Sequence, residues 1–274
     1  MSNRHHDRTG NRMTAPIRRV DRTYRGRPTH HYVDEHGERI DGVTTILKDG
    51  KPSPALIGWG IRSVAEYAVN HWDDLAGLPV ADRIKTLKGS PYAERDEAAR
   101  RGTEVHAIAE RIGRGEEVEV PDELAGHVES AVRFYDEWQP RILLAEVVVY
   151  NMEHRYAGTL DFIAEFPDGR VGLCDFKTSK GVYADTALQL AAYRNASHYL
   201  DDDCEPQPMP AVDWCGVVHV RADGYDVYEL RADEHVYRRF RYVQMVARTM
   251  AEMDEWKSPA LDAPQPMLDL GVTA

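Results

Sequence analysis

Apolar residues concentrate in three short segments between residues 143 and 180, and polar turn residues separate the segments. The segments read LLAEVVVY at 143–150, YAGTLDFIAEF at 156–166 and RVGLCDFKTSK at 170–180. Their lengths and their β-branched and aromatic residues are typical of strands. The tripeptide Pro167-Asp168-Gly169 between the second and third segments suits a three-residue hairpin loop, which favours Gly in the left-handed region. We therefore predict three antiparallel strands.

The predicted hairpin loop also sets the register of the second and third strands. Counting outward from the loop centre at Asp168, Asp161 falls directly opposite Asp175. Lys177 shares their face of the sheet, because side chains alternate between the two faces. The two aspartates would have Cβ atoms roughly 5 Å apart, where like charges destabilise a sheet unless something positive lies between them. A divalent cation is the simplest candidate.

A third carboxylate, Glu146, lies inside the apolar run of the first strand. A two-residue loop at Glu153-His154 would place Glu146 opposite Asp161, because both residues lie equally far from the centre of that loop. A carboxylate among apolar residues is costly to desolvate, which favours a cation or a hydrogen-bonding partner here. The alternative, which stays open, is that Glu146 faces solvent on an edge strand.

Helical periodicity marks much of the remaining chain. We predict helices over 53–70, 80–87, 90 to 113 or 115, 121–138, 185–199 and 233–256, from the spacing of apolar residues and from Ser, Asp or Pro at most of their starts. Trp59 and Tyr67 on the first of these helices are expected in the core. Turn residues at 36–37 and 222–224 predict two further hairpins, and residues 43–47 form a β-rich run.

Composition narrows the class of protein. The chain has 274 residues, 42% hydrophobic and 29% charged, enough for one substantial core. No apolar run approaches the roughly 18 residues that indicate a membrane span, and the N-terminus lacks the hydrophobic segment of a signal peptide. We expect a soluble, intracellular, cytoplasmic protein with no membrane partner. Three cysteines without CxxC spacing indicate neither a zinc site nor a disulfide framework.

Five elements in order carry a resemblance to a known family. Asp161 followed by Asp175-Phe176-Lys177 on the next strand resembles the signature of the PD-(D/E)XK nuclease superfamily. Gly102-Thr103-Glu104-Val105-His106 and Gln189-Leu190-Ala191-Ala192-Tyr193 are similar to the GxxxH and QxxxY motifs of its RecB-like branch, which includes mitochondrial genome maintenance exonuclease and CRISPR-associated exonucleases. The resemblance covers roughly residues 92–230, and Leu160 stands where the family has proline.

The resemblance implies an α+β fold, with the αβββαβ core of restriction-endonuclease-like proteins. Its mixed sheet would be flanked by helices, with additional N- and C-terminal helices. Many CRISPR-associated relatives bind an iron–sulfur cluster through four cysteines, and this chain has three, so no such cluster is expected.

The resemblance also implies a function: metal-dependent hydrolysis of DNA phosphodiesters, as an exonuclease in DNA recombination, repair or phage DNA metabolism. One or two Mg²⁺ or Mn²⁺ ions would be held by His106, Glu146, Asp161, Asp175 and the Phe176 carbonyl. Lys177 would orient or deprotonate the attacking water and offset charge. Gln189 and Tyr193 would position Lys177 or a phosphate.

Other interpretations compete with these roles. A lone helical His106 is more often structural than a ligand, and Thr186 with Gln189 also fits a capping box at a helix start. A structure-specific or restriction-type endonuclease would share the chemistry and differ in how DNA enters. A catalytically idle DNA-binding recombination accessory protein is the remaining alternative, which the intact acid and lysine positions oppose.

The charge distribution shapes the expected domains. The net charge is −12, yet residues 1–30 carry eight arginines and two aspartates. We expect a basic arm at 1–28, either a disordered tail or a contact to nucleic acid. One nuclease domain would span 29–256, comprising a hairpin and helices at 29–90, a catalytic core at 91–231 and a C-terminal helix at 232–256. A disordered tail would follow at 257–274. The expected partners are DNA, single-stranded or with a free end, and a recombination protein.

Overall fold

Two mixed β-sheets with helices around them make up the structure, a computed structural model that describes residues 15–24 and 27–260. Within those residues, one sheet has seven strands in the order β1-β2-β3-β6-β5-β9-β10 and the other has five in the order β12-β11-β8-β7-β4. The strands of the first sheet are β1 (Ile17–Tyr24), β2 (Arg27–Asp34), β3 (Arg39–Gly42), β5 (Val148–Asn151), β6 (Tyr156–Thr159), β9 (His198–Leu200) and β10 (Pro206–Pro208). Those of the second are β4 (Arg141–Ala145), β7 (Phe162–Glu165), β8 (Val171–Lys177), β11 (Trp214–Arg221) and β12 (Gly224–Glu229).

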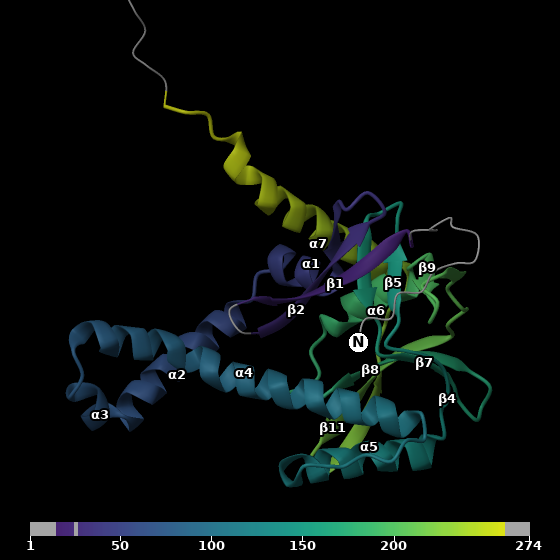
Figure 1. The fold of residues 1–274 in the computed structure, drawn as a ribbon, viewed down its shortest axis with the longest axis horizontal. Helices are drawn as coiled ribbons and strands as arrows, with labels where there is room; N and C mark the ends of the chain where they lie inside the picture. The colour runs from purple at the N-terminus through teal and green to yellow at the C-terminus, as the bar shows by residue number, and fades with distance from the viewer. Residues whose placement is uncertain (1–14, 25–26, 261–274) are drawn as a thin grey trace, which may run out of the picture.

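Helices lie on both sides of the five-stranded sheet (Figure 1). They are α1 (Val43–Gly50), α2 (Pro54–Asn70), α3 (Trp72–Ala76), α4 (Val80–Gly113), α5 (Ala125–Trp138), α6 (Thr186–Arg194) and α7 (Glu234–Glu252), with 3₁₀ turns at Asp122–Leu124 and Met253–Trp256. The α+β class is confirmed. The predicted order of helix, three strands, helix and strand is wrong in its strand count, because five strands, β4 to β8, lie between α5 and α6, and β9 and β10 precede β11, which is parallel to β8.

The first two predicted strands are each broken in the middle, which corrects the prediction of three continuous strands. The first half of the first segment, β4, pairs with the second half of the second segment, β7, in the five-stranded sheet. The remaining halves, β5 and β6, pair in the seven-stranded sheet. Glu146 lies at the break with φ of 52°, in the left-handed region, so the chain changes direction there. Backbone hydrogen bonds continue across the break, because the Glu146 amide donates to the Asp161 carbonyl at 2.8 Å. The same two strands therefore join both sheets.

The predicted registers are confirmed. β7 and β8 pair Phe162 with Cys174, which continues to Asp161 opposite Asp175. β5 and β6 pair Asn151 with Tyr156, the register that places Glu146 opposite Asp161. The turn between β5 and β6 covers the four residues 152–155 rather than the predicted two.

Two apolar layers hold the helices to the five-stranded sheet. Phe162, Cys174 and Phe176 face α4 and α5, where they pack around Phe134. On the opposite face, Leu173 belongs to a second buried cluster that includes residues of α1, α6 and α7. The face with Leu173 is also that of Asp175 and Lys177, as strand alternation predicts.

Several N-terminal predictions are wrong. The basic arm does not extend to residue 28, because β1 pairs along its whole length with β2 and its Ile17 is buried. Residues 1–14 lie outside the described residues. Residues 43–47 form helix α1 rather than a strand, since Val43, Ile46 and Gly50 follow a helical spacing and all three are buried. The hairpin at 36–37 is confirmed by the β2–β3 pairing.

The helices also differ from prediction in extent. Residues 80–113 form one helix that continues through Pro91, instead of two. Helix α6 ends at Arg194 rather than at Tyr199, because residues 198–200 add strand β9 to the seven-stranded sheet. The predicted C-terminal helix and its Asp233 cap are confirmed, with the Asp233 carboxylate accepting from the Val236 amide at 3.0 Å. Of the expected tail at 257–274, residues 261–274 lie outside the described residues.

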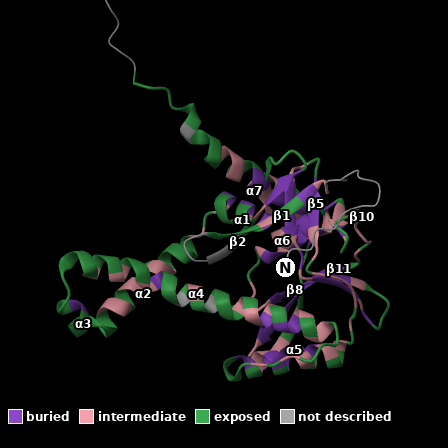
Figure 2. Ribbon diagram, in the orientation of Figure 1, coloured by how far each residue is buried: buried purple, intermediate pink, exposed green. Residues whose placement is uncertain are grey.

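Helices α2 and α3 and the start of α4 form an arm that projects from the sheets (Figures 1 and 2). Trp59 and Tyr67 are half-buried on this arm and do not belong to the core as expected. The expectation failed because α2 contacts α3 and α4 instead of a sheet, so its apolar residues are largely exposed. No helix in 15–24 or 27–260 is long and apolar enough to cross a membrane.

Candidate metal centre

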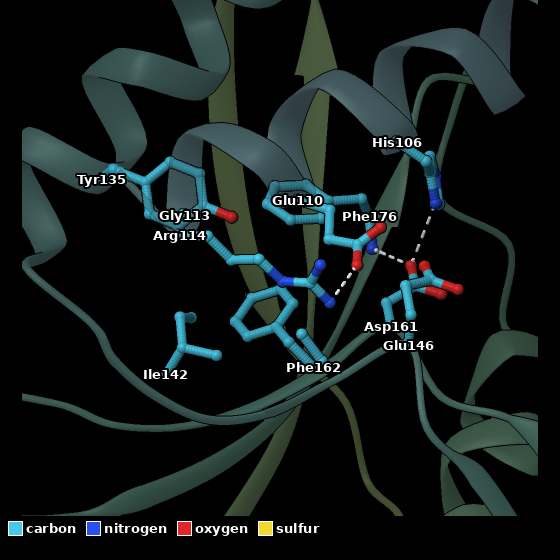
Figure 3. Close-up of a pocket in the computed structure, with 11 residues that line it drawn as sticks. His106, Glu110, Gly113, Arg114, Tyr135, Ile142, Glu146, Asp161, Phe162 and Phe176 are labelled. Carbon is cyan, nitrogen blue, oxygen red and sulfur yellow. Dashed lines mark hydrogen bonds and ion pairs between the residues drawn. The ribbon is translucent and has the colours of Figure 1, made fainter. Parts of the chain in front are cut away.

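His106, Glu146 and Asp161 come together where the two sheets meet (Figure 3). His106 lies on α4, Glu146 at the β4–β5 break and Asp161 at the β6–β7 break. One potential ligand atom of each lies within 4.8 Å of those of the other two. The His106 Nδ1 atom is 3.3 Å from the Asp161 Oδ2 atom. Three residues predicted as metal ligands are therefore grouped by segments far apart in the sequence.

Gly102 brings α4 close to the end of β8. A Cβ atom on Gly102 would lie 3.1 Å from the Thr178 hydroxyl, closer than most such contacts. His106 follows one helical turn later and its ring packs edge-on against Phe176, with ring centroids 6.1 Å apart. The absence of a side chain at Gly102 permits this close approach, which places His106 beside the sheet.

The Asp161 carboxylate is held by the next strand. The Phe176 amide donates to its Oδ2 atom at 2.7 Å, which fixes the side chain beside β8. Burial and the nearby Asp175 carboxylate nevertheless raise the pKa of Asp161 well above its ordinary value. Positive charge at this point would therefore stabilise the ionised form.

Glu146 combines features of both interpretations of its position. Its side chain is exposed, as the edge alternative proposed, yet it also lies in the group with His106 and Asp161. Desolvation by neighbouring protein atoms, followed by the charge of Asp161, raises the pKa of Glu146 to about 7. The carboxylate is thus accessible to solvent, and near neutral pH it can exchange its proton for a metal cation.

His106 is favoured as a neutral ring. Burial lowers the pKa of His106 below its ordinary value, although the Asp175 charge and a hydrogen bond with the Phe176 backbone oppose the shift. Neutral imidazole is the form that coordinates metals. The Phe176 amide, which donates to Asp161, shows that the Phe176 main chain lies at this site, and its carbonyl remains a predicted ligand.

Asp175 lies beside the group of three and has partners of its own. It is 1% exposed and forms an ion pair with Lys177. The Gln189 side-chain amide donates to the Asp175 Oδ1 atom at 3.0 Å and lies 3.5 Å from the Tyr193 hydroxyl. Gln189 and Tyr193 therefore face the site together, and Gln189 positions Asp175 rather than acting in a capping box.

Lys177 is held in its charged form. Burial alone would disfavour the ammonium, but the charges of Asp175 and Asp161 outweigh burial and raise the pKa of Lys177. A lysine in this state donates hydrogen bonds and offsets negative charge. This favours the orienting role over proton abstraction, between which the sequence left the choice open.

Tyr193 is seated by a glycine on the neighbouring sheet. A Cβ atom on Gly158 in β6 would lie 2.4 Å from the Tyr193 ring, so the ring occupies the space that a larger residue would fill. The Tyr193 hydroxyl can reach Gln189 because of this packing. The QxxxY spacing thus links α6 to both sheets.

Sequence analysis missed three residues of the pocket beside the metal group. Glu110, Arg114 and Tyr135 line it together with His106 and Glu146 (Figure 3). Glu110 is paired with Arg114 at 2.5 Å. Glu110 lies four residues after His106, a spacing that puts both on one helical face, so this signal was available in the sequence.

The donor set fits a divalent cation. One imidazole and two or more carboxylates suit Mn²⁺, Mg²⁺ and related ions, and the raised carboxyl pKa values indicate a site that lacks positive charge. All three cysteines are free thiols, with Cys174 and Cys215 buried and Cys204 exposed. Fold and site together define an α+β protein with a candidate metal centre of His and acidic residues.

Comparisons with known proteins add little to this definition. No protein-family model and no curated protein matches the chain. A solved structure described as "Crystal structure of SSO0001" is 13% identical, with a TM-score of 0.30, over 79% of this chain and 76% of that one. Similarity at this level carries no functional inference, so function must be argued from the site.

Proposed function

We propose that the protein is a divalent-metal-dependent deoxyribonuclease that hydrolyses phosphodiester bonds. The observation that carries this proposal is the grouping of His106, Glu146 and Asp161 beside the charged pair of Asp175 and Lys177. A cation site next to a half-buried ammonium suits an anionic substrate whose charge increases in the transition state. The five matched motif elements support DNA as that substrate.

His106, Glu146 and Asp161 would hold the cation, with Asp175 and the Phe176 carbonyl as further ligands. Mg²⁺ and Mn²⁺ are the proposed ions. Of the two, Mn²⁺ is favoured, because an imidazole among oxygen ligands suits Mn²⁺ better than Mg²⁺. When bound, such an ion polarises the phosphate and makes a water molecule more acidic.

The residues of the chain have distinct tasks in this mechanism. Lys177, kept protonated by Asp175, would orient the attacking water and offset negative charge at the phosphate. Gln189 would hold Asp175 in place, and so hold Lys177. Arg114, the C-cap residue of α4, is paired with Glu110, lines the same pocket and would contact a neighbouring phosphate.

We further propose the mode and setting expected from the motifs. The enzyme would act as an exonuclease on DNA that is single-stranded or has a free end. Its setting would be the cytoplasm, in recombination, repair or phage DNA metabolism.

Digestion of end-labelled linear DNA and closed circular DNA, each single- and double-stranded, tests the proposal. We expect cleavage with Mg²⁺ or Mn²⁺ and none in excess EDTA. Asp161→Asn should abolish cleavage, whereas Asp168→Asn, which alters an exposed carboxylate in the adjacent hairpin loop, should keep it. Degradation of linear DNA alone supports an exonuclease. Cleavage of circular DNA would instead indicate an endonuclease. Equal activity of the Asp161 variant, or cleavage in EDTA, would overturn the mechanism.

A further inference from the structure

Helix α7 has apolar residues on two opposite faces. Its inner face packs into the core, where Phe240 is fully buried and Val236 and Val243 pack around it. A second set of apolar residues is 46–65% exposed and continues into the following 3₁₀ turn. This outer stripe consists of Tyr242, Met245, Val246, Met250, Met253 and Trp256.

The outer stripe is continuous. Steps of three and four residues from Tyr242 through Val246 to Met250 and Met253 keep these side chains on one side of a helix. Phe240 and Gln244, which are buried, lie on the opposite side. The C-terminal part of α7 leads away from the sheets and is exposed (Figures 1 and 2). The stripe therefore faces away from the rest of the molecule.

Charge is distributed unevenly along the stripe. Exposed Arg238 and Arg239 lie at its N-terminal end, and exposed Glu252 and Glu255 lie at its C-terminal end. An antiparallel neighbour with the same sequence would place arginines next to glutamates at both ends. A parallel neighbour would place like charges together. The stripe is thus complementary to an antiparallel copy of itself.

We propose that the outer stripe is the interface of a two-fold symmetric homodimer, in which the α7 helices of two copies pack antiparallel. The two-fold axis passes near Val246, so that Tyr242 of each copy lies near Met250 of the other. Because the core-packing face lies opposite the stripe, each body lies behind its own helix and leaves the contact open. The charged ends set the direction of pairing.

The second copy fits better than other occupants. A lipid surface or a nucleic acid is anionic and would be repelled by Glu252 and Glu255 at one end of the stripe. The exposed side chains offer several hundred Å² per copy, somewhat below the roughly 800 Å² per partner of a standard stable interface. We therefore expect a reversible dimer whose population rises over the micromolar concentration range.

Sedimentation equilibrium of the full chain in metal-free buffer measures the association directly. The wild-type protein should dimerise, and Val246→Glu should weaken association by at least tenfold, since it places two charges at the axis. Ile57→Glu on α2 is the control, because Ile57 is another exposed apolar residue, 67% exposed against 47% for Val246, on the separate arm. Circular dichroism verifies that both variants are folded.

Charge reversal tests the antiparallel arrangement. Arg238→Glu with Arg239→Glu should weaken the dimer, and adding Glu252→Arg with Glu255→Arg should restore it, because each end again meets an opposite charge. A monomeric wild type, a dimer disrupted by the α2 variant instead, or no rescue by the fourfold variant would overturn the proposal. These measurements need neither DNA nor a metal, so they are independent of the proposed nuclease activity.

Discussion

Replacing Lys177 with Met separates the structural and chemical parts of the site. Asp175 is almost completely buried, and its partners are the Lys177 ammonium and the Gln189 amide. The Met side chain keeps much of the apolar stem and removes the charge. Asp175 then remains as a buried carboxylate that is stabilised by Gln189 but by no adjacent cation.

The magnitude follows from the buried charge. Breaking a buried ion pair by removing one partner costs about 3–5 kcal/mol. Since Gln189 still donates to Asp175, we expect the lower end, about 3 kcal/mol of unfolding free energy. In a protein of this size each kcal/mol lowers the melting temperature by roughly 2–4 °C, so a decrease of about 6–12 °C is expected. Lys177→Met combined with Asp175→Asn should regain most of this loss, because no unpaired charge remains.

The chemical part is measured by DNA cleavage and DNA binding on the same variant. Turnover should fall by about two or more orders of magnitude, the usual scale for a positioned electrostatic group. Affinity for DNA in Ca²⁺ should change only a few-fold. Intact single-turnover cleavage with weaker, less salt-sensitive binding would instead make Lys177 a phosphate anchor. Unchanged melting of the single variant would refute the buried-pair argument.

Three further predictions concern the ligands and their support. The raised pKa of Glu146, about 7, means that the metal-free folded state loses stability as pH rises toward and through 7, while cation binding becomes easier. The increase in melting temperature on adding Mn²⁺ should therefore be larger at pH 8 than at pH 6, and an equal increase would argue against Glu146 as a ligand. Mn²⁺ should support cleavage at least as well as Mg²⁺, in parallel titrations. Gly158→Ala should destabilise the protein by about 1–3 kcal/mol in urea unfolding, because its Cβ would displace the Tyr193 ring; no change would show that the ring can move freely.

The register of the strands that carry Asp161 and Asp175 was predictable because it depends on local rules. Pro167-Asp168-Gly169 dictates a loop of fixed length, and strand alternation then assigns every side chain to a face. Those two facts are sufficient to bring Asp161 opposite Asp175 and to place Lys177 on their side. The same counting placed Glu146 opposite Asp161 although the first turn is longer than expected, because only the centre of a turn determines the register.

Other features depend on contacts that a local pattern does not contain. Residues 43–47 have strand propensity, but the burial of Val43 and Ile46 against α6 and α7 stabilises a helix instead. Likewise, the apolar periodicity of α2 is real, yet nothing in the sequence says that this helix packs against α4 on an exposed arm. The partners of Asp175 were also unpredictable, since Gln189 can cap its own helix or reach across to β8, and only the packing of α6 decides.

The break in the two strands that carry Glu146 and Asp161 shows why the candidate site lies where it does. In an uninterrupted strand, side chains would alternate between the two faces of one sheet, and Glu146 would belong to that sheet alone. A left-handed backbone at a non-glycine residue costs on the order of 1 kcal/mol, and glycine would relieve it. Glycine would also remove the carboxylate. A glutamate nevertheless occupies this strained position, at the junction of two sheets and within reach of His106 and Asp161. This is expected if the carboxylate, through a bound cation, contributes more to the protein than the strained backbone costs in stability.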